Sequence, residues 1–156
     1  MKLSNNFTLA EMTKSQIATR KGISNDATDE HIENMRLLCV HVLQPVRNKF
    51  GSTTISSGYR SEDLNEAIGG STTSQHSKGE AADFECVEKD NYGLAVWISQ
   101  ILDFDQLILE YLDDDDPHAG WIHCSYVGPW EDGINRKEIL KAEKIDGKTV
   151  YTKIEL

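Results

Sequence analysis

The chain has 156 residues, a length that fits one domain with a substantial hydrophobic core. It carries 26 acidic residues against 16 basic ones, and its net charge of −10 would attract neither a nucleic acid nor an anionic membrane surface. Its 3 cysteines are widely spaced and form no CxxC pair, which argues against a disulfide framework or a thiolate zinc knuckle. We therefore expect a single domain over residues 1–156, acting as a monomer.

No apolar stretch has the length of a membrane span. The longest, residues 94–102, is interrupted by Ser99 and Gln100. The N-terminal residues 1–6 also lack the apolar segment that a signal peptide needs. We expect synthesis in the cytoplasm without a signal peptide, no membrane anchor, and any export by a route that the sequence does not reveal.

Helices are predicted for the first third of the chain. A short helix is expected over Phe7–Ser15. A longer helix is expected from about Asp29 to Lys49, because Thr28 is a favourable N-cap and apolar residues recur along one stripe. Pro45 should kink this helix or break it near its last turn.

Strands dominate the remainder of the chain. Four are predicted before the tail: Thr53–Ser57, Ala81–Val87, Gln106–Tyr111 and Trp121–Tyr126. Two helices lie between them, one capped by Ser61 and one over about Asn91–Leu102. In the tail, Asp146-Gly147 between alternating residues predicts a type I′ hairpin over about 138–155. This order predicts an α+β domain, with a helical N-terminal region packed on a small, mainly antiparallel sheet.

The segment Ser74–Asp83 combines a histidine in a polar loop with an aspartate in an apolar strand. A carboxylate buried at Asp83 would need a cation or several donors, and zinc accepts both imidazole and carboxylate ligands. His123 is the best third ligand. If its strand and that of Asp83 share a sheet, alternation allows the two side chains to converge. We predict one Zn²⁺ per chain, held by His76, Asp83 and His123.

The other histidines are given structural roles. His31 and His41 lie on the long predicted helix and are expected to serve packing or surface contacts. His118 follows the acidic run Asp113–Asp116 and is expected to be solvated, with a substrate contact as the second interpretation. The acidic run lacks the ligand spacing and glycine of an EF-hand, so a solvated loop near the cleft is expected rather than a calcium site.

Two motifs carry a resemblance to a known family. Residues 74–83 have the pattern Ser-x-His-x-x-Gly-x-Ala-x-Asp, and residues 121–123 have the pattern Trp-x-His. Together they resemble the zinc D-Ala-D-Ala carboxypeptidase family, whose fold is similar to that of phage L-alanyl-D-glutamate endopeptidases, vancomycin-resistance D,D-dipeptidases and the hedgehog signalling domain. The resemblance covers about residues 43–126, the expected catalytic core. It also includes Ser56–Arg60, Leu64-Asn65, Gly69-Gly70 and Phe104–Ile108.

The resemblance implies specific roles for residues of this chain. His76, Asp83 and His123 would be the zinc ligands, and Arg60 would steady the oxygen of the scissile carbonyl as negative charge develops there. Ser74 would orient a ligand or touch substrate, although simple loop hydrogen bonding explains it equally well.

Three further residues are expected to contact substrate. They are Tyr59, Gln75 and Trp121, each of which is adjacent to a residue of the motifs.

The general base is the point at which the chain departs from part of the family. The dipeptidase branch has a glutamate three residues before the last histidine, and that position is Gly120 here. Glu110, at the end of an apolar strand, is our candidate for taking a proton from the attacking water. The residues of the run Asp113–Asp116 are its rivals.

The resulting hypothesis is a zinc metallopeptidase that hydrolyses peptidoglycan stem peptides, of either the D-Ala-D-Ala carboxypeptidase or the L-Ala-D-Glu endopeptidase type. We expect a phage-type endolysin that acts on the cell wall from an infected host or from a virion. The alternatives are a non-catalytic zinc-binding module and a phage tail-associated component. A hydrolase with Cys124 as nucleophile is disfavoured, because its neighbour His123 would point to the opposite strand face.

Overall fold

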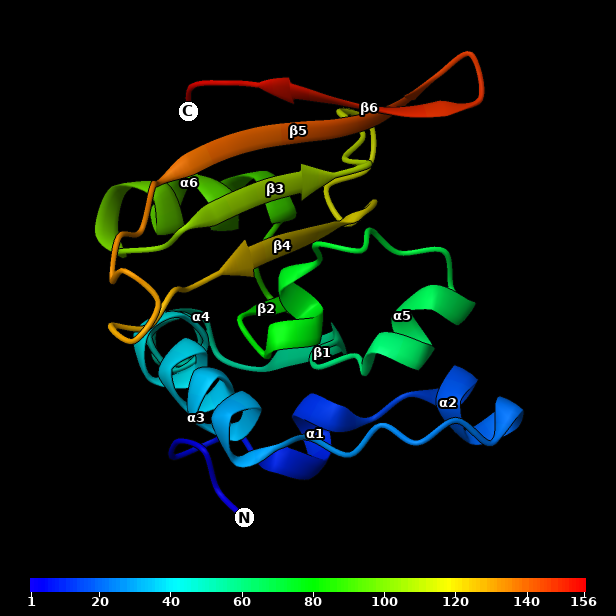
Figure 1. Cartoon of the computed structure of the whole chain (residues 1–156). Coiled ribbons are helices and arrows are strands. Elements are labelled where there is room, and N and C mark those ends of the chain that lie inside the picture. Colours follow the sequence, from blue (N-terminus) through cyan, green and yellow to red (C-terminus); the bar gives the residue numbers. More distant parts are fainter.

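The computed structural model of residues 1–156 contains one six-stranded sheet in the order β1-β2-β4-β3-β5-β6 (Figure 1). Neighbouring strands are antiparallel except β3 and β5, which are parallel. The strands span Thr53–Ser57 (β1), Ala81–Cys86 (β2), Gln106–Glu110 (β3), Trp121–Ser125 (β4), Glu138–Ile145 (β5) and Lys148–Lys153 (β6). The predicted α+β class with a mainly antiparallel sheet is confirmed.

The N-terminal region is helical and lies beside the β1 end of the sheet (Figure 1). Its segments are α1 (Leu9–Thr13), α2 (Gln16–Lys21), α3 (Asp29–Leu38), a π-helical turn (Cys39–Leu43) and α4 (Gln44–Phe50). The α2 helix was not predicted from the sequence. It is only 6 residues long and begins where the Ser15 side chain accepts a hydrogen bond from the backbone N–H of Ala18.

The predicted helix over 29–49 is present, but the π-helical turn divides it. Thr28 caps α3 as expected, accepting a hydrogen bond from the backbone of His31. The wider turn is closed by the Gln44 backbone N–H, which donates to the carbonyl of Cys39. Pro45 then lies in the first turn of α4, where the missing N–H of proline is tolerated. The interruption therefore precedes Pro45 instead of falling in the last turn.

The remaining predicted elements are confirmed with small shifts at their ends. They are α5 (Glu62–Ala67), capped by Ser61, and α6 (Asn91–Ile101); a short 3-10 turn, η2 (Gln75–Lys78), was not predicted. The β5–β6 hairpin turns at Asp146 and Gly147, whose φ angles of 51° and 79° are both left-handed, as a type I′ turn requires. None of the helices combines the length and the apolar character needed to cross a bilayer.

Strand alternation assigns the two faces of the sheet to different tasks. Phe84 on β2 and Ile122 on β4 are fully buried within a core cluster of 22 residues, which also takes in side chains from α3 and α6. Asp83 and His123, one position along each strand, project to the opposite face. Packing on the first face therefore fixes where the polar side chains of the second face lie.

Glu80, which directly precedes β2, is a buried acid without a partner. Its side chain is 0% exposed, and neither carboxylate oxygen has a hydrogen-bond partner. Burial raises the pKa of Glu80 to about 7, and the charge of Glu131 acts in the same direction while Lys78 opposes it. In the folded protein Glu80 is therefore mainly protonated below a pH of about 7.

Substitution of Glu80 by glutamine is expected to change how stability depends on pH. The folded-state pKa of about 7 exceeds the ordinary value of 4.5, so the contribution of Glu80 is full below pH 4.5 and is lost as the pH rises through 7. At pH 8, Glu80→Gln should raise the free energy of unfolding by about 2–3 kcal/mol, with little change at pH 4.5. Urea unfolding at both pH values measures this, with the exposed Glu88→Gln as control. Equal effects of Glu80→Gln at the two pH values would contradict the assignment.

Candidate metal centre

Three potential metal ligands converge on the open face of the sheet. Asp83 and His123 are directly paired across β2 and β4, and His76 reaches them from the η2 turn. The Oδ1 atom of Asp83 lies 3.0 Å from Nδ1 of His123 and 3.4 Å from Nε2 of His76. One donor atom from each residue lies within 4.8 Å of the other two. The sequence prediction that Asp83 and His123 converge is confirmed.

The η2 turn holds His76 in place through its two ends. At the start, the Ser74 hydroxyl accepts a hydrogen bond of 3.2 Å from the His76 backbone N–H. At the end, Gly79 adopts a φ of 78°, and a Cβ there would lie 2.5 Å from the carbonyl oxygen of His31. A larger residue would therefore push the turn away from α3. This bond caps the turn, so it is accounted for by the simple loop hydrogen bonding considered for Ser74, and it leaves a contact with a metal ligand's ring or with substrate as a prediction.

The ring of His76 is oriented by the backbone. Its Nδ1 lies 2.7 Å from the carbonyl oxygen of Gly58, which can only accept a hydrogen bond. Nδ1 must therefore carry the proton, which leaves the lone pair of Nε2 directed at Asp83. Burial lowers the pKa of His76, so the imidazole is neutral, the form that binds metals.

Asp83 is held in its charged form. Burial alone would raise the pKa of this carboxyl, but the hydrogen bond from His123 to Oδ1 acts against burial, and the pKa lies well below the ordinary value. Two imidazoles and one carboxylate form the ligand set of a catalytic zinc site, which leaves a fourth position open for water or substrate. The residues present therefore fit a zinc ion.

The cluster lies in a cleft of about 810 Å³ that crosses the open face of the sheet. The loop between α5 and β2 forms one side, and the β5–β6 hairpin forms another (Figure 1). Besides the three candidate ligands, the predicted site residues Arg60, Ser74, Gln75, Glu110 and Trp121 line this cleft.

Glu110 lies on β3 directly opposite Trp121 on β4. The Trp121 indole Nε1–H donates a hydrogen bond to Oε2 of Glu110. Burial raises the pKa of Glu110, and the charge of Asp83 acts in the same direction. A carboxylate with a raised pKa, on the same face as the metal cluster, is suited to exchanging a proton.

Gly120 explains why no glutamate occupies its position. Its φ is 70°, and a Cβ there would lie 2.0 Å from the carbonyl oxygen of Glu110. Any side chain at this position would force β4 away from β3. The backbone therefore excludes the base position of the dipeptidase branch and leaves Glu110 as the carboxylate in this part of the cleft.

Arg60 follows β1 and enters the cleft from the side of β2. Its backbone N–H donates to the carbonyl of His76 at 3.1 Å, which ties the two residues together. Burial lowers the pKa of Arg60, against the opposing charges of Asp83 and Glu110, but a guanidinium remains charged at any ordinary pH. Its buried Nε has no hydrogen-bond partner in the protein.

Of the residues expected to contact substrate, Gln75 and Trp121 lie in the metal cleft and Tyr59 does not. Gln75 lines the cleft and donates to Asp105 at 3.0 Å, and Trp121 lines it beside Glu110. Tyr59 is only 5% exposed and lies against the ring of His31, with 4.9 Å between ring centroids. The structure does not bring Tyr59 to the metal cleft, but places it on a neighbouring depression beside β1.

Three of the cleft residues that the sequence did not indicate come from the C-terminal segment. Leu140 and Tyr151 project from the hairpin, and Arg136 precedes it. The guanidinium of Arg136 forms an ion pair of 2.9 Å with the buried Asp105. Local patterns carry no signal for a contact between residues so far apart in the chain.

Residues that were given structural roles lie outside the cluster. His31 accepts a hydrogen bond in the cap of α3, His41 stacks on Tyr126, and His118 is in an exposed loop. Cys124 is fully buried on the core face, and burial raises the pKa of its thiol. Both its position and its protonation disfavour a thiolate nucleophile.

The α+β fold places a His-Asp-His cluster, which could hold a metal ion, in an open cleft. The family model for Peptidase M15 matches residues 5–125, and the chain therefore belongs to the Peptidase M15 family. This confirms the resemblance that the motifs at 74–83 and 121–123 indicated. The match also includes the N-terminal helices and ends before the β5–β6 hairpin. No curated protein matches the chain. Membership of this family supports a metallopeptidase with peptidoglycan-type substrates.

The metal cluster can be tested by direct binding. Purified protein should bind one Zn²⁺ per chain, because the cluster offers one set of three ligands. His76→Ala and Asp83→Ala should each lose most of this zinc on dialysis, and the zinc-dependent rise in melting temperature should disappear with it. His118→Ala, a change in an exposed loop, is the matched control. Unchanged zinc content in His76→Ala would refute the cluster as the metal site.

Proposed function

We propose that this chain is a zinc-dependent peptidoglycan peptidase that hydrolyses an amide bond of the stem peptide, with His76, Asp83 and His123 as the zinc ligands. The observation that carries the proposal is the placement of a carboxylate, Glu110, and a guanidinium, Arg60, in the same cleft as the metal cluster. Amide hydrolysis needs both an acceptor for the proton of the attacking water and a stabiliser for the developing oxyanion.

Zinc, when bound, lowers the pKa of water from about 15.7 towards about 7 and polarises a carbonyl group. Glu110 accepts the proton from the attacking water and passes it to the leaving amine. The indole of Trp121 engages only Oε2, so Oε1 is available for this proton. The rivals Asp113–Asp116 are exposed and do not line the cleft, which favours Glu110 as the base.

Arg60 is the residue that stabilises negative charge on the scissile carbonyl oxygen. Its backbone is tied to that of His76, which places the start of its side chain beside the metal cluster. Partial burial strengthens the interaction of a fixed positive charge with a developing negative one.

The stem peptide is the substrate that family membership supports, and the bond cut is either L-Ala-D-Glu or one that ends in D-Ala. Ser74, Gln75 and Trp121 are the proposed substrate contacts in the cleft. The biological role we propose is that of a phage-type endolysin, from the resemblance to the phage L-alanyl-D-glutamate endopeptidases. A non-catalytic zinc-binding module of the same fold is the alternative outcome of the test below.

Substitution of Glu110 by glutamine keeps its shape and removes its basicity. Cleavage of purified peptidoglycan should fall by about 10²–10⁴-fold, the usual contribution of general acid–base catalysis, while zinc content stays at one per chain. Mass spectrometry of the soluble fragments, with and without a chelator, measures the loss and identifies the bond. Asp114→Asn, in the exposed acidic loop, is the control and should cleave normally. If zinc-loaded protein releases no fragments, the enzyme hypothesis fails and the binding-module interpretation replaces it.

Arg60→Gln should mainly lower kcat, because the interaction it removes strengthens as the oxyanion forms. We expect a loss of about 10²–10³-fold in kcat, with a smaller change in KM, for a defined stem-peptide substrate. The variant must retain its zinc and its unfolding midpoint for the comparison to hold. A variant with normal kcat and only a raised KM would show that Arg60 binds substrate without stabilising the transition state.

A further inference from the structure

A second depression adjoins the metal cleft on the side of the N-terminal helices. It lies between α2 and α5, beside β1, and consists of two adjoining pockets that share Ile17, Arg20 and Ile68. We call it the α2–α5 groove. Its hydrophobic side chains are Ile17, Ile55, Tyr59, Leu64, Ala67 and Ile68.

The charged residues of the α2–α5 groove are all basic. They are Lys14, Arg20, Lys21 and Arg60, and none of the residues that line the groove is acidic. This is the reverse of the whole chain, which has 26 acidic and 16 basic residues. None of the four forms a salt bridge within the protein.

Helix stability explains only part of this concentration of charge. Arg20 and Lys21 lie in the last turn of α2, where basic residues interact favourably with the helix dipole. Lys14 is the C-cap residue of α1 and also lies at a helix C-terminus, whereas Arg60 follows β1 and gains nothing from a helix. Cations gathered from three segments repel one another, and an anionic ligand would relieve that repulsion.

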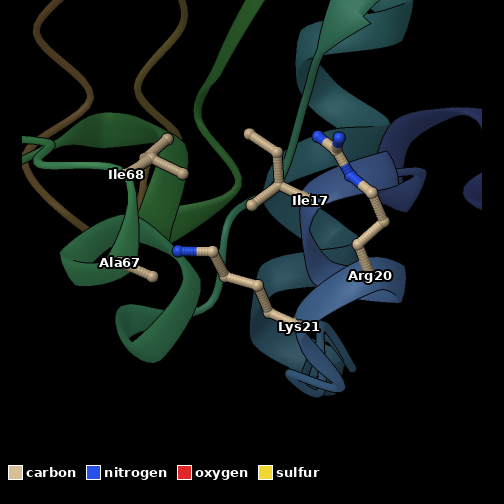
Figure 2. Close-up of a pocket in the computed structure, with 5 residues that line it drawn as sticks. All are labelled: Ile17, Arg20, Lys21, Ala67 and Ile68. Carbon is tan, nitrogen blue, oxygen red and sulfur yellow. The ribbon is translucent and has the colours of Figure 1, made fainter.

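The side chains frame an apolar surface. In Figure 2, Lys21 extends from α2 towards Ala67 and Ile68, whereas the guanidinium of Arg20 lies on the other side of Ile17. Positive groups therefore flank small hydrophobic side chains. Such a surface is complementary to a peptide that carries free carboxylates and small apolar side chains.

The groove adjoins the metal cleft. Arg60 and Ile68 line both depressions and form the boundary between them. A substrate with its scissile bond at the metal cluster would reach Arg20 and Lys21 by crossing these two residues.

We propose that the α2–α5 groove is a substrate subsite, in which Arg20 and Lys21 bind free carboxylates of the peptide at a distance from the scissile bond. This inference rests on the proposed peptidase function. The groove selects for an anionic peptide chain, and the favourable local field offsets the general repulsion between an acidic protein and an anionic wall polymer.

The test compares two double charge reversals with the same change in net charge. Arg20→Glu/Lys21→Glu alters the groove, and Lys144→Glu/Lys148→Glu alters exposed lysines at the far end of the β5–β6 hairpin. For a stem peptide with free carboxylates, the groove variant should raise KM about tenfold or more and leave kcat within about twofold. The hairpin variant should match the wild type.

The same peptide with its distal carboxylates amidated identifies the group that is recognised. The KM of the wild type should be about tenfold higher for this peptide than for the free one, and the groove variant should bind both peptides equally weakly. Arg20→Gln/Lys21→Gln, which removes charge without adding acids, should give the same pattern in a milder form. The proposal would be overturned if the groove and hairpin variants had equal KM values. It would also be overturned if the groove variant raised KM by the same factor on the free and the amidated peptide.

A binding measurement separates this inference from the proposed function. Calorimetric titration of zinc-loaded Glu110→Gln protein with the two peptides needs no turnover. Carboxylate-dependent binding that the groove reversal abolishes would support the subsite even if the wild type cleaved nothing, in which case only the peptidase function would fail. Equal affinity for the free and the amidated peptide would overturn the subsite, whether or not the wild type cleaves either of them.

Discussion

The pairing of Asp83 with His123 is the constraint on which the site depends. The two residues face each other across β2 and β4, and their neighbours Phe84 and Ile122 are buried in the core. A slip of one residue in this register would expose the apolar set and bury the polar one, so hydrophobic packing locks the ligands together. The charge of Asp83 is costly to bury, and the hydrogen bond from His123 offsets part of that cost.

The sequence predicted what local patterns determine. Alternation placed Asp83 and His123 on matching faces, and Asp146-Gly147 marked the hairpin, because these patterns depend on few residues close in the chain. The six-residue α2 and the π-helical turn before Pro45 were missed, since tertiary contacts override weak local preferences. The contributions of Arg136 and Tyr151 to the cleft depend on contacts between distant segments, which no local pattern encodes.

The cleft also illustrates how backbone geometry constrains chemistry. Gly120 must remain glycine because its backbone passes against the carbonyl of Glu110. The carbonyl oxygen that excludes a side chain at position 120 therefore belongs to Glu110, the residue whose own side chain supplies a carboxylate. Trp121 completes the arrangement by holding one oxygen of that carboxylate. Glu110 on β3, Trp121 on β4 and Gly120, which directly precedes β4, thus determine which residue can supply a carboxylate here, and a substitution at Gly120 would disturb the other two.

The β5–β6 hairpin lies beyond the part of the chain that the family model matches, and it pairs with β3 through β5. Without it, β3 would be an edge strand, with unpaired backbone groups beside Glu110 that invite another chain to add to the sheet. The hairpin moves the free edge to β6, a short strand that carries Lys148 and Lys153 at its ends. Lysines on an edge discourage such pairing. The hairpin therefore covers the edge of β3, the strand that bears the proposed base, and prevents another chain from pairing with it.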